Sequence, residues 1–367
     1  MNQLNSSDKA YKGKAIIVGA SLSGLMTGIS LAREGMQVTI VEKTKEGERT
    51  GAGLQVDGNS FNQNATAKLL RELASGGKSS IQLWTSIEYR LRTEAKAQPG
   101  IEILYDQRVK EIGQDEDSAW LMIDDGETIL GDILIGADGH YSMVRGHIAP
   151  HKPDAKFAGY MVWISSIDEE ELPVEQRPDP NLPQVSMLGS FNGFLFGSIM
   201  DQGENNSRRI GCTWYDNTHN DVLREFGCVE GTIVHHSLNG IDIPEGILQQ
   251  LVDKAAVRWP KPWSYAILHA IKTRNIIGIP IKEYIPDYLV KDRIALIGDA
   301  AHVPAPITAS GFNASLDDAV ELGKSVAKGV QGKAGIKALK KYESGRLKIA
   351  RRMVQSGNSF SQSFGQP

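Results

Sequence analysis

The sequence predicts an α/β fold: a Rossmann-like nucleotide-binding domain with an inserted, mainly antiparallel β-sheet domain and a C-terminal helical segment. Three observations support this prediction. A strand, a helix and a second strand surround a glycine-rich turn near the start, short apolar runs separated by polar turns fill the middle, and strand–helix character returns near residue 293. The expected boundaries are residues 1–155 for the first part of the nucleotide-binding domain, 156–285 for the β-sheet domain, and 286–367 for the second part with the C-terminal helices.

The composition is that of an ordinary globular protein. With 367 residues, 41% of them hydrophobic and 23% charged, the chain is long enough for two packed units. The formal net charge of −4 offers no basic surface for a nucleic acid, and two cysteines are too few for a disulfide framework or a zinc site. The polar start lacks the apolar run of a signal peptide, and no stretch reaches the ~18 apolar residues of a membrane span. We therefore expect a cytoplasmic protein with no metal, no nucleic-acid partner and no integral membrane association.

The first element pattern is a βαβ unit. Residues 14–19 form a short apolar strand that ends in a glycine, residues 22–34 place apolar side chains on one helical face, and residues 36–42 form a second apolar strand. Strand, helix and strand within about thirty residues are typical of a parallel pair joined by a crossover helix.

The turn inside this unit predicts a dinucleotide site. It matches the G-x-G-x-x-G pattern from Gly19 to Gly24, except that Ser21 stands at the middle glycine. The helix start presents N–H groups to a pyrophosphate, and Glu42, at the end of the second strand, is placed to accept hydrogen bonds from a ribose. The alternative is a structural turn with a surface glutamate. The candidate nucleotide-binding residues are Gly19, Ser21, Leu22, Ser23, Gly24, Glu42 and Lys43.

The middle of the chain predicts an antiparallel sheet with an apolar pocket wall. Between residues 159 and 217, apolar and aromatic runs alternate with turn-rich pieces such as residues 178–180 and 202–207. Aromatic side chains on these strands are candidates for the walls of a substrate pocket, although half of the side chains of any such strand belong to the sheet core. The candidate substrate-contacting residues are Trp163, Phe194, Phe196, Trp214 and Tyr215.

Two later motifs decide which dinucleotide is expected. The first is an apolar strand that ends in Asp138-Gly139 and is followed by Ser142 and Arg145. The second is Gly298-Asp-Ala-Ala-His302, which follows the strand 294–297 and continues through Pro306, Gly311 and Asn313.

As a set, these motifs resemble those of the class A FAD-dependent aromatic hydroxylases, the p-hydroxybenzoate hydroxylase superfamily. The likeness covers nearly the whole chain. Within that superfamily, the strings at residues 18–25, 158–163 and 357–365 are similar to those of the 2,6-dihydroxypyridine 3-hydroxylase-like monooxygenases.

The resemblance implies FAD as the cofactor and gives the motifs their roles. Asp299 would bind a ribityl hydroxyl, and Asp138 and Arg145 would contribute to the handling of both FAD and the nicotinamide. The turn after Asp299 would pass close to the isoalloxazine, and the helix that starts near Asn313 would direct its positive end at the reduced flavin. The cofactor-binding residues implied in this way are Asp138, Arg145, Gly298, Asp299, Pro306, Gly311, Phe312 and Asn313.

The resemblance also implies the reaction. NADH or NADPH would serve as a transient co-substrate, and O2 would be activated as a flavin C4a-hydroperoxide that hydroxylates an electron-rich aromatic or heteroaromatic small molecule. Because the flavin carries this chemistry, the protein needs no nucleophile of its own. His302 and Pro306 are weak candidates for a catalytic role, and structural packing is the alternative for His302. A homodimer is left open.

Three departures from the family pattern bear on cofactor binding. Ala309 stands where a second glycine is usual, and Ser21 replaces the middle glycine of the first turn. Trp84 stands where many members carry an arginine, which leaves Arg90 and Arg92 as candidate substitutes.

Other flavin-dependent functions remain as alternatives. A flavin halogenase is disfavoured because residues 162–167 lack the second Trp and the Pro of the usual Trp-x-Trp-x-Ile-Pro string. An antibiotic-modifying monooxygenase of the tetracycline type and a non-hydroxylating flavoprotein are the two alternatives that we retain.

Overall fold

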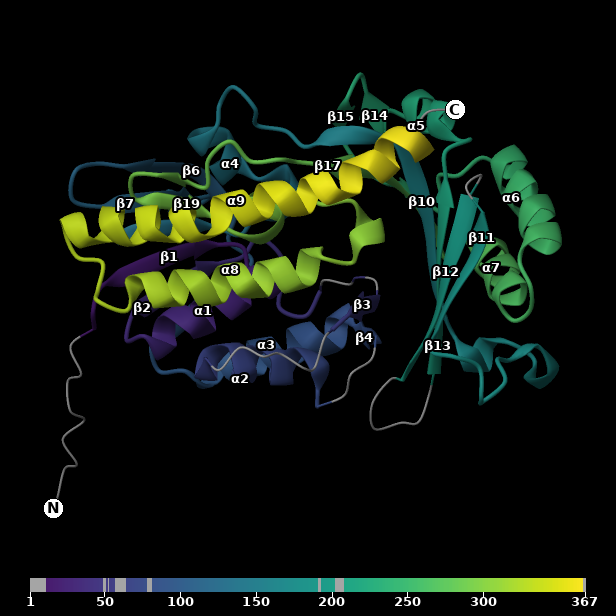
Figure 1. The fold of residues 1–367 in the computed structure, drawn as a ribbon, viewed down its shortest axis with the longest axis horizontal. Coiled ribbons are helices and arrows are strands. Elements are labelled where there is room, and N and C mark those ends of the chain that lie inside the picture. Colours follow the sequence, from purple (N-terminus) through teal and green to yellow (C-terminus); the bar gives the residue numbers. More distant parts are fainter. Residues whose placement is uncertain are drawn as a thin grey trace, which may run out of the picture.

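The computed structural model describes residues 11–48, 51, 53–56, 64–77, 81–190, 193–201 and 208–365. Two bodies lie side by side in it. An α/β body contains segments from the beginning and the end of the chain, and a body built on a large antiparallel sheet contains the middle (Figure 1).

A six-stranded sheet forms the centre of the α/β body. Its strands are near-continuous apolar runs, and the innermost ones are buried on both faces, which is typical of parallel sheets covered by other layers. β18 alone runs antiparallel to its neighbour among these six strands. In spatial order the strands are β18 (Val290–Lys291), β19 (Ile294–Leu296), β9 (Ile133–Gly136), β1 (Lys14–Val18), β2 (Gln37–Val41) and β5 (Ile101–Leu104).

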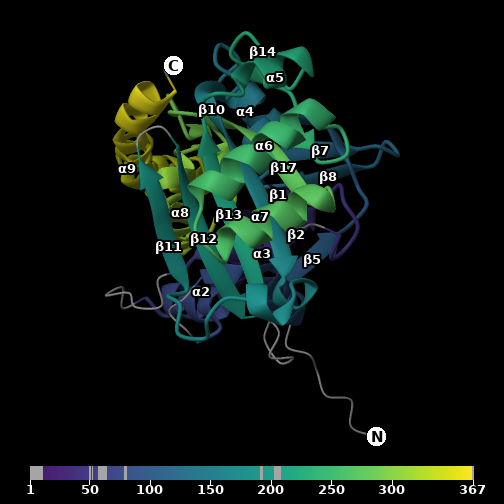
Figure 2. The ribbon, with the colours of Figure 1, turned by 90° about the vertical axis from the view of Figure 1, so that its right-hand side faces the viewer.

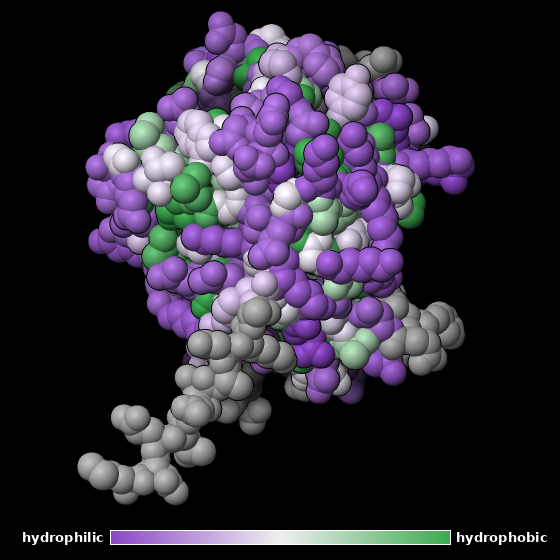
Figure 3. Space-filling view, turned by 90° about the vertical axis from the view of Figure 1, so that its left-hand side faces the viewer, coloured by the Kyte–Doolittle hydropathy of each residue, from purple (hydrophilic) through white to green (hydrophobic). Residues whose placement is uncertain are grey.

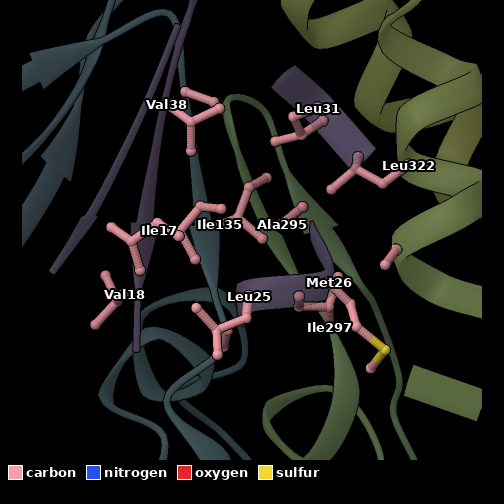
Figure 4. Close-up of a cluster of buried hydrophobic side chains, with 14 of the residues drawn as sticks. Ile17, Val18, Leu25, Met26, Leu31, Val38, Ile135, Ala295, Ile297 and Leu322 are labelled. Carbon is pink, nitrogen blue, oxygen red and sulfur yellow. The ribbon is translucent and has the colours of Figure 1, made fainter. Parts of the chain in front are cut away.

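Helices pack against this sheet and against one another. Figure 4 shows Leu25 of α1 close to Ile17 and Ile135 of the sheet, and Leu322 of α8 beside Leu31 of α1. A three-stranded antiparallel sheet packs against β1 and β9, and the antiparallel strand pair β3–β4 contacts β12 of the large sheet. These elements are α1 (Leu22–Arg33), α2 (Ala65–Ser75), α3 (Trp84–Ala97), α4 (Met143–Ile148), α8 (Gly311–Val326), α9 (Lys333–Phe364), β3 (Gly53–Gln55), β4 (Ile81–Leu83), β6 (Val109–Gln114), β7 (Ala119–Ile123) and β8 (Thr128–Gly131).

The second body is an eight-stranded sheet in which every pairing is antiparallel, as the sequence predicted for the middle of the chain. Two helices, α6 and α7, lie across one of its faces (Figure 2). The elements are β10 (Lys156–Asp168), β11 (Val185–Ser190), β12 (Gly193–Asp201), β13 (Arg208–Asp216), β14 (Val229–Glu230), β15 (Ile233–Val234), β16 (Leu238–Asn239), β17 (Ile276–Glu283), α5 (Asn220–Glu225), α6 (Glu245–Arg258) and α7 (Trp263–Lys272).

The large sheet has two different faces because successive side chains of a strand alternate between them. On the helix-covered face, Trp163 and Trp214 share a core with Trp263 of α7. On the opposite face, here called the inner face, Tyr215 and Phe194 pack with the C-terminal end of α9. The inner face is the one directed at the α/β body (Figure 1).

Helix α9 joins the two bodies. The sequence predicted a C-terminal helical segment, and α9 runs from Lys333 to Phe364 within it. Its first half packs on the α/β body through Leu339 and Tyr342, and its end reaches the large sheet (Figure 1).

Figure 3 shows that the end of the molecule opposite the large sheet is mostly hydrophilic. No helix in the described part of the chain is both long enough and apolar enough to cross a membrane.

Candidate functional site

The first glycine-rich turn is shaped by two positions that exclude a side chain. Gly19 has φ +102°, and a Cβ there would lie 2.6 Å from the carbonyl oxygen of Ala137. A Cβ on Gly24 would lie 1.9 Å from the carbonyl oxygen of Gly19. These approaches place the turn against the end of β9 and aim the start of α1 at the space between them. Ser21 directly precedes α1, and its hydroxyl makes no capping hydrogen bond.

Glu42 braces this turn from the end of β2. Its carboxylate accepts hydrogen bonds from the N–H of Ala20 at 2.8 Å and from the N–H of Thr44 at 2.9 Å, and its side chain is buried. The hydroxyl of Thr44 also donates to Oε1 of Glu42 at 3.0 Å, so this carboxylate ties the glycine-rich turn to the segment that follows β2. The neighbouring Lys43 is exposed, and Leu22 is packed in the core.

A pocket of about 250 Å³ lies in front of the turn. The pocket brings all three motifs together, although they are far apart in the sequence. Its lining residues are Ser21, Ser23, Trp84, Ala137, Gly139, His140 and Asp299.

Trp84, and neither of the two nearby arginines, lines this pocket. It is the first residue of α3 and packs against Gly51, where a Cβ would meet its ring at 2.5 Å. Arg90 instead donates to the backbone carbonyls of α2, including that of Ala74 at 2.8 Å. Arg92 pairs with Glu88 at 3.5 Å on its own helix. The structure thus places an aromatic ring where the family pattern led us to look for a cation.

The Asp-Gly motif is closed by hydrogen bonds within its own loop. Asp138 accepts from the hydroxyl of Ser142 at 2.5 Å and from the N–H of Val144 at 3.2 Å. Burial raises the pKa of Asp138, and these two hydrogen bonds oppose that shift.

Arg145 fastens the second motif to the third. It is fully buried, and its guanidinium donates to the backbone carbonyls of Pro153 at 2.6 Å and Ala300 at 3.2 Å. It also lies over the ring of Tyr284, 4.6 Å from the centroid. Arg145 therefore stabilises the loops behind the pocket, because backbone carbonyl groups of the protein accept the hydrogen bonds that its guanidinium donates.

Asp299 faces the pocket. Its side chain is 41% exposed, and its Oδ2 lies 3.2 Å from Nε2 of His140. A carboxylate in this position is able to accept hydrogen bonds from the hydroxyl groups of a bound ligand. His140 was not among the residues predicted from the sequence; its place directly after Asp138-Gly139 was the signal that could have identified it.

The segment from Pro306 to Asn313 turns into α8 where the sequence predicted. Pro306 begins a short 3₁₀ turn, and α8 starts at Gly311 with Phe312 buried behind it. Asn313 Oδ1 lies 3.4 Å from Nη1 of Arg71. Ala309 has φ +47°, a left-handed conformation that costs a residue with a Cβ about 1 kcal/mol, which explains why a glycine is usual here.

His302 lies in the interior, away from the pocket. Its Nε2 is 2.7 Å from Oδ2 of Asp318, whose Oδ1 accepts from Nε of Arg346 at 2.7 Å. Burial alone would raise the pKa of Asp318, but His302, Arg346 and the N–H of Gly298 outweigh it, so the pKa is lowered. All three side chains are buried, which supports the packing role for His302.

The five candidate aromatic residues divide between the two faces of the large sheet. Trp163 and Trp214 belong to the helix-covered face, where the Trp163 Nε1 donates to Asp216 at 2.8 Å. The other three lie on the inner face, where the rings of Phe194 and Tyr215 stack with centroids 4.2 Å apart. The members of this inner group are Phe194, Phe196 and Tyr215.

Comparison with known proteins identifies the nucleotide-binding part. Residues 12–80 and 260–357 match the family described as "FAD binding domain". The prediction of FAD as the cofactor is therefore confirmed.

Curated relatives extend the similarity over nearly the whole chain. The chain is 27% identical to a 3-hydroxybenzoate 6-hydroxylase of Klebsiella oxytoca, across 94% of this chain and 86% of that one. It is 25% identical to an FAD-dependent urate hydroxylase of Klebsiella pneumoniae, across 93% and 88% of the two chains.

Solved structures share the fold. The 2,6-dihydroxypyridine-3-hydroxylase of Arthrobacter nicotinovorans superimposes with a TM-score of 0.77 at 19% identity, covering 96% of this chain and 93% of that one. A Klebsiella pneumoniae protein in complex with FAD and uric acid gives a TM-score of 0.71 at 19% identity, with 96% and 89% covered. The predicted fold class and the likeness to class A flavoprotein hydroxylases are both confirmed.

Proposed function

We propose that this chain, a class A aromatic-hydroxylase-like flavoprotein, uses FAD, NADH or NADPH, and O2 to hydroxylate an electron-rich aromatic or heteroaromatic small molecule. The observation that carries the proposal is the convergence of three motifs on one pocket, together with Ile307 of the segment after the third motif, which packs against the aromatic inner face of the large sheet. Its relatives are named as FAD-dependent or aromatic-compound hydroxylases, which supports the same class of reaction.

The described residues fit FAD. The close approaches at Gly19 and Gly24 leave room for a pyrophosphate at the start of α1, where helix N–H groups and the helix dipole favour an anion. Glu42 would accept from the adenosine ribose, and Asp299 from the ribityl chain. The start of α8 at Gly311 would place positive potential near the isoalloxazine. When bound, FAD would supply the redox chemistry that reduces O2 at the expense of the nicotinamide.

The role of the protein in this proposal is to orient and to exclude water. Arg145 ties together the two loops that frame the pocket, so the carboxylate of Asp299 is held at its edge. The inner face of the sheet would orient the aromatic ring and keep water away from it. The proposal requires no protein nucleophile, so the burial of His302 is no obstacle to it.

We also propose a cytoplasmic location for the protein. Both cysteines, Cys212 and Cys228, are buried free thiols. Free thiols are compatible with a reducing compartment, and we place the protein in the cytoplasm on that ground.

The primary experiment is a coupled assay on the FAD-loaded protein. Oxidation of NADH and NADPH is followed with and without a panel of phenols, hydroxypyridines and polyketide antibiotics, and products are examined by mass spectrometry with ¹⁸O₂. Substrate-stimulated oxidation with one labelled oxygen in the product is the expected result. Flavin that is reduced at the same rate with every compound, without an oxygenated product, would contradict the proposal.

A variant pair tests the assignment of the cofactor residue. Asp299→Ala should lower the FAD occupancy of the purified protein, because the variant loses a ribityl acceptor at the pocket edge. Asp253→Ala, at an exposed position on α6, is the matched control and should retain wild-type occupancy. Full occupancy of Asp299→Ala would remove the ribityl contact from the scheme.

A further inference from the structure

We propose that the inner face of the large sheet accepts a neutral, apolar aromatic substrate and disfavours a carboxylate or other anion. This inference rests on the proposed function and specifies the substrate class of the same site.

The strand register determines which side chains form the inner face. Ile164 of β10 pairs with Thr213 of β13, which in turn pairs with Phe196 of β12. The next paired positions on either side lie on the same face. They are Val162 and Tyr215 on one side, and Ser166, Gly211 and Ser198 on the other. The outer positions belong to the edge strand β11 and to β17. They are Met187, Val185, Ile277 and Ile279.

Phe194 and Tyr215 of this face are buried against the end of α9, but the neighbouring part of the face is accessible, whereas the helix-covered face is not. Ile164, Thr213 and Phe196 are each partly exposed, although the residue on either side of each is buried on the other face. Farther out, Ile277 is 39% exposed and Met187 is 64% exposed. A contiguous apolar surface that a folded chain leaves accessible, with a few hydroxyl groups among its aromatic rings, is typical of a small-molecule site.

The inner face lies next to the loop that is expected to approach the flavin. Ile307, one residue after Pro306, packs in the same cluster as Phe196 and Ile279. Phe360, from the end of α9, contacts Phe194 at 5.6 Å between ring centroids. A ligand against this face would therefore be bordered by the third motif and by α9.

The paired inner-face positions run across the sheet from Met187 on β11 to Ile277 on β17. Among the described residues at these positions there is no lysine, arginine or histidine. The first cation along β13 is Arg209, which lies 3.4 Å from Asp168 and donates to the carbonyl of Ser166. Two cations beside the pocket motifs are also engaged, since Lys282 lies over the ring of Tyr141 and Arg71 pairs with Asp317.

The chemistry of burial then selects the substrate. A carboxylate that leaves water for an apolar face loses its hydration, and it regains that free energy only if a cation or several donors replace the water. The inner face offers hydroxyl groups from Thr213, Ser198 and Ser166, which suit a phenol O–H or a ring N–H. Burial raises the pKa of Tyr215, so its phenol remains a neutral group on this face.

The test uses matched neutral and anionic ligands on the FAD-loaded protein. Binding of 3-hydroxybenzamide and 3-methylphenol is compared with that of 3-hydroxybenzoate by the change in flavin absorbance at pH 7, and hydroxylated product is measured separately. We expect each neutral ligand to bind at least about tenfold more tightly than the carboxylate. Equal or tighter binding of the carboxylate would overturn the inference, and so would the absence of binding by all three ligands.

A variant places a cation on the face itself. Thr213→Arg should strengthen binding of 3-hydroxybenzoate by about tenfold or more, because the guanidinium supplies the missing partner. Thr213→Gln, which is long and polar but uncharged, is the control and should leave the preference for neutral ligands in place. An unchanged preference in a folded Thr213→Arg variant would show that the carboxylate does not meet this face.

The two proposals fail in different ways. Tight binding of the neutral ligands without any hydroxylated product would contradict the proposed monooxygenase activity but would still support the proposed ligand class. Hydroxylation with a preference for the carboxylate would do the reverse.

Discussion

The two faces of the large sheet are formed by the same strands but carry different environments. Trp163 and Ile164 are adjacent on β10, yet Trp163 is 1% exposed in a core beneath α6 and α7, and Ile164 is partly exposed toward the α/β body. The same holds on β13 for Trp214 and Thr213. The layer that covers a face, and not the type of side chain, decides whether an aromatic residue acts as core or as a pocket wall.

Because the two faces differ in this way, we expect one face to contribute to the stability of the fold and the other to the choice of ligand. Substitutions on the helix-covered face should change the free energy of unfolding and leave ligand preference alone, while substitutions on the inner face should do the opposite. The following variants test this separation, from the largest expected effect to the smallest.

Trp214→Ala should destabilise the protein by about 3 to 5 kcal/mol, because a fully buried ring is removed from the core. The ring also makes an edge-on contact with Trp259, with centroids 5.7 Å apart. Urea unfolding followed by circular dichroism measures the loss, and Trp214→Phe is the matched variant, with a smaller loss. A change below about 1 kcal/mol would show that this face is not packed as the structure has it.

Asp216→Asn should destabilise by about 1 to 3 kcal/mol, because Trp163 Nε1 and His219 Nδ1 both lie against this buried carboxylate. Burial alone would raise the pKa of Asp216, but His219, Trp163 and the N–H of Thr218 outweigh it and lower the pKa below the usual 3.8.

The sign of this shift fixes the pH dependence. A lowered carboxyl pKa contributes stability that is present above about pH 4 and is lost as the pH falls through the lower, folded-state value. The difference in unfolding free energy between wild type and Asp216→Asn should therefore be constant near pH 5 to 6 and shrink below about pH 4. A difference that grows on acidification would contradict the sign.

Phe196→Ala should cost below about 2 kcal/mol of stability, because its ring is only partly buried on the inner face. The same change should raise the KM for the aromatic substrate by about tenfold, since the ring is a central part of the proposed pocket wall. Steady-state kinetics and urea unfolding on one preparation measure both quantities. A large stability loss without a change in KM would place Phe196 in the core.

Met187→Gln should have the smallest effect, a change in unfolding free energy within about 0.5 kcal/mol, because this side chain on the edge strand is 64% exposed. A loss well above that would mean that another layer covers the outer margin of the inner face. Thermal unfolding of the two proteins side by side is sufficient for the comparison.

The nucleotide turn was the part of the site most open to prediction. Its requirements are local, since Gly19 and Gly24 are demanded by a turn of six residues and Glu42 follows at the end of the next strand. The third motif was similarly informative about Asp299 and the start of α8 at Gly311. The positive φ of Ala309 also agrees with the glycine expected there.

Other residues could not be placed from the sequence. His140 was not predicted although it directly follows Asp138-Gly139, and Trp84 was noted only as a departure from the family pattern. Both line the pocket because separate loops meet there. His302 stands in a motif that pointed to chemistry, yet Asp318 and Arg346 on two later helices enclose it.

The sequence by itself determined the order of the elements, the glycine-rich turn before α1 and the antiparallel character of the middle, because each of these depends on neighbours within about thirty residues. Only the tertiary structure decided which face of the large sheet is covered by helices and which is left accessible beside the pocket. The alternation of side chains along a strand produces two faces but does not determine which of them is covered. The helices that cover one face come from a later part of the chain.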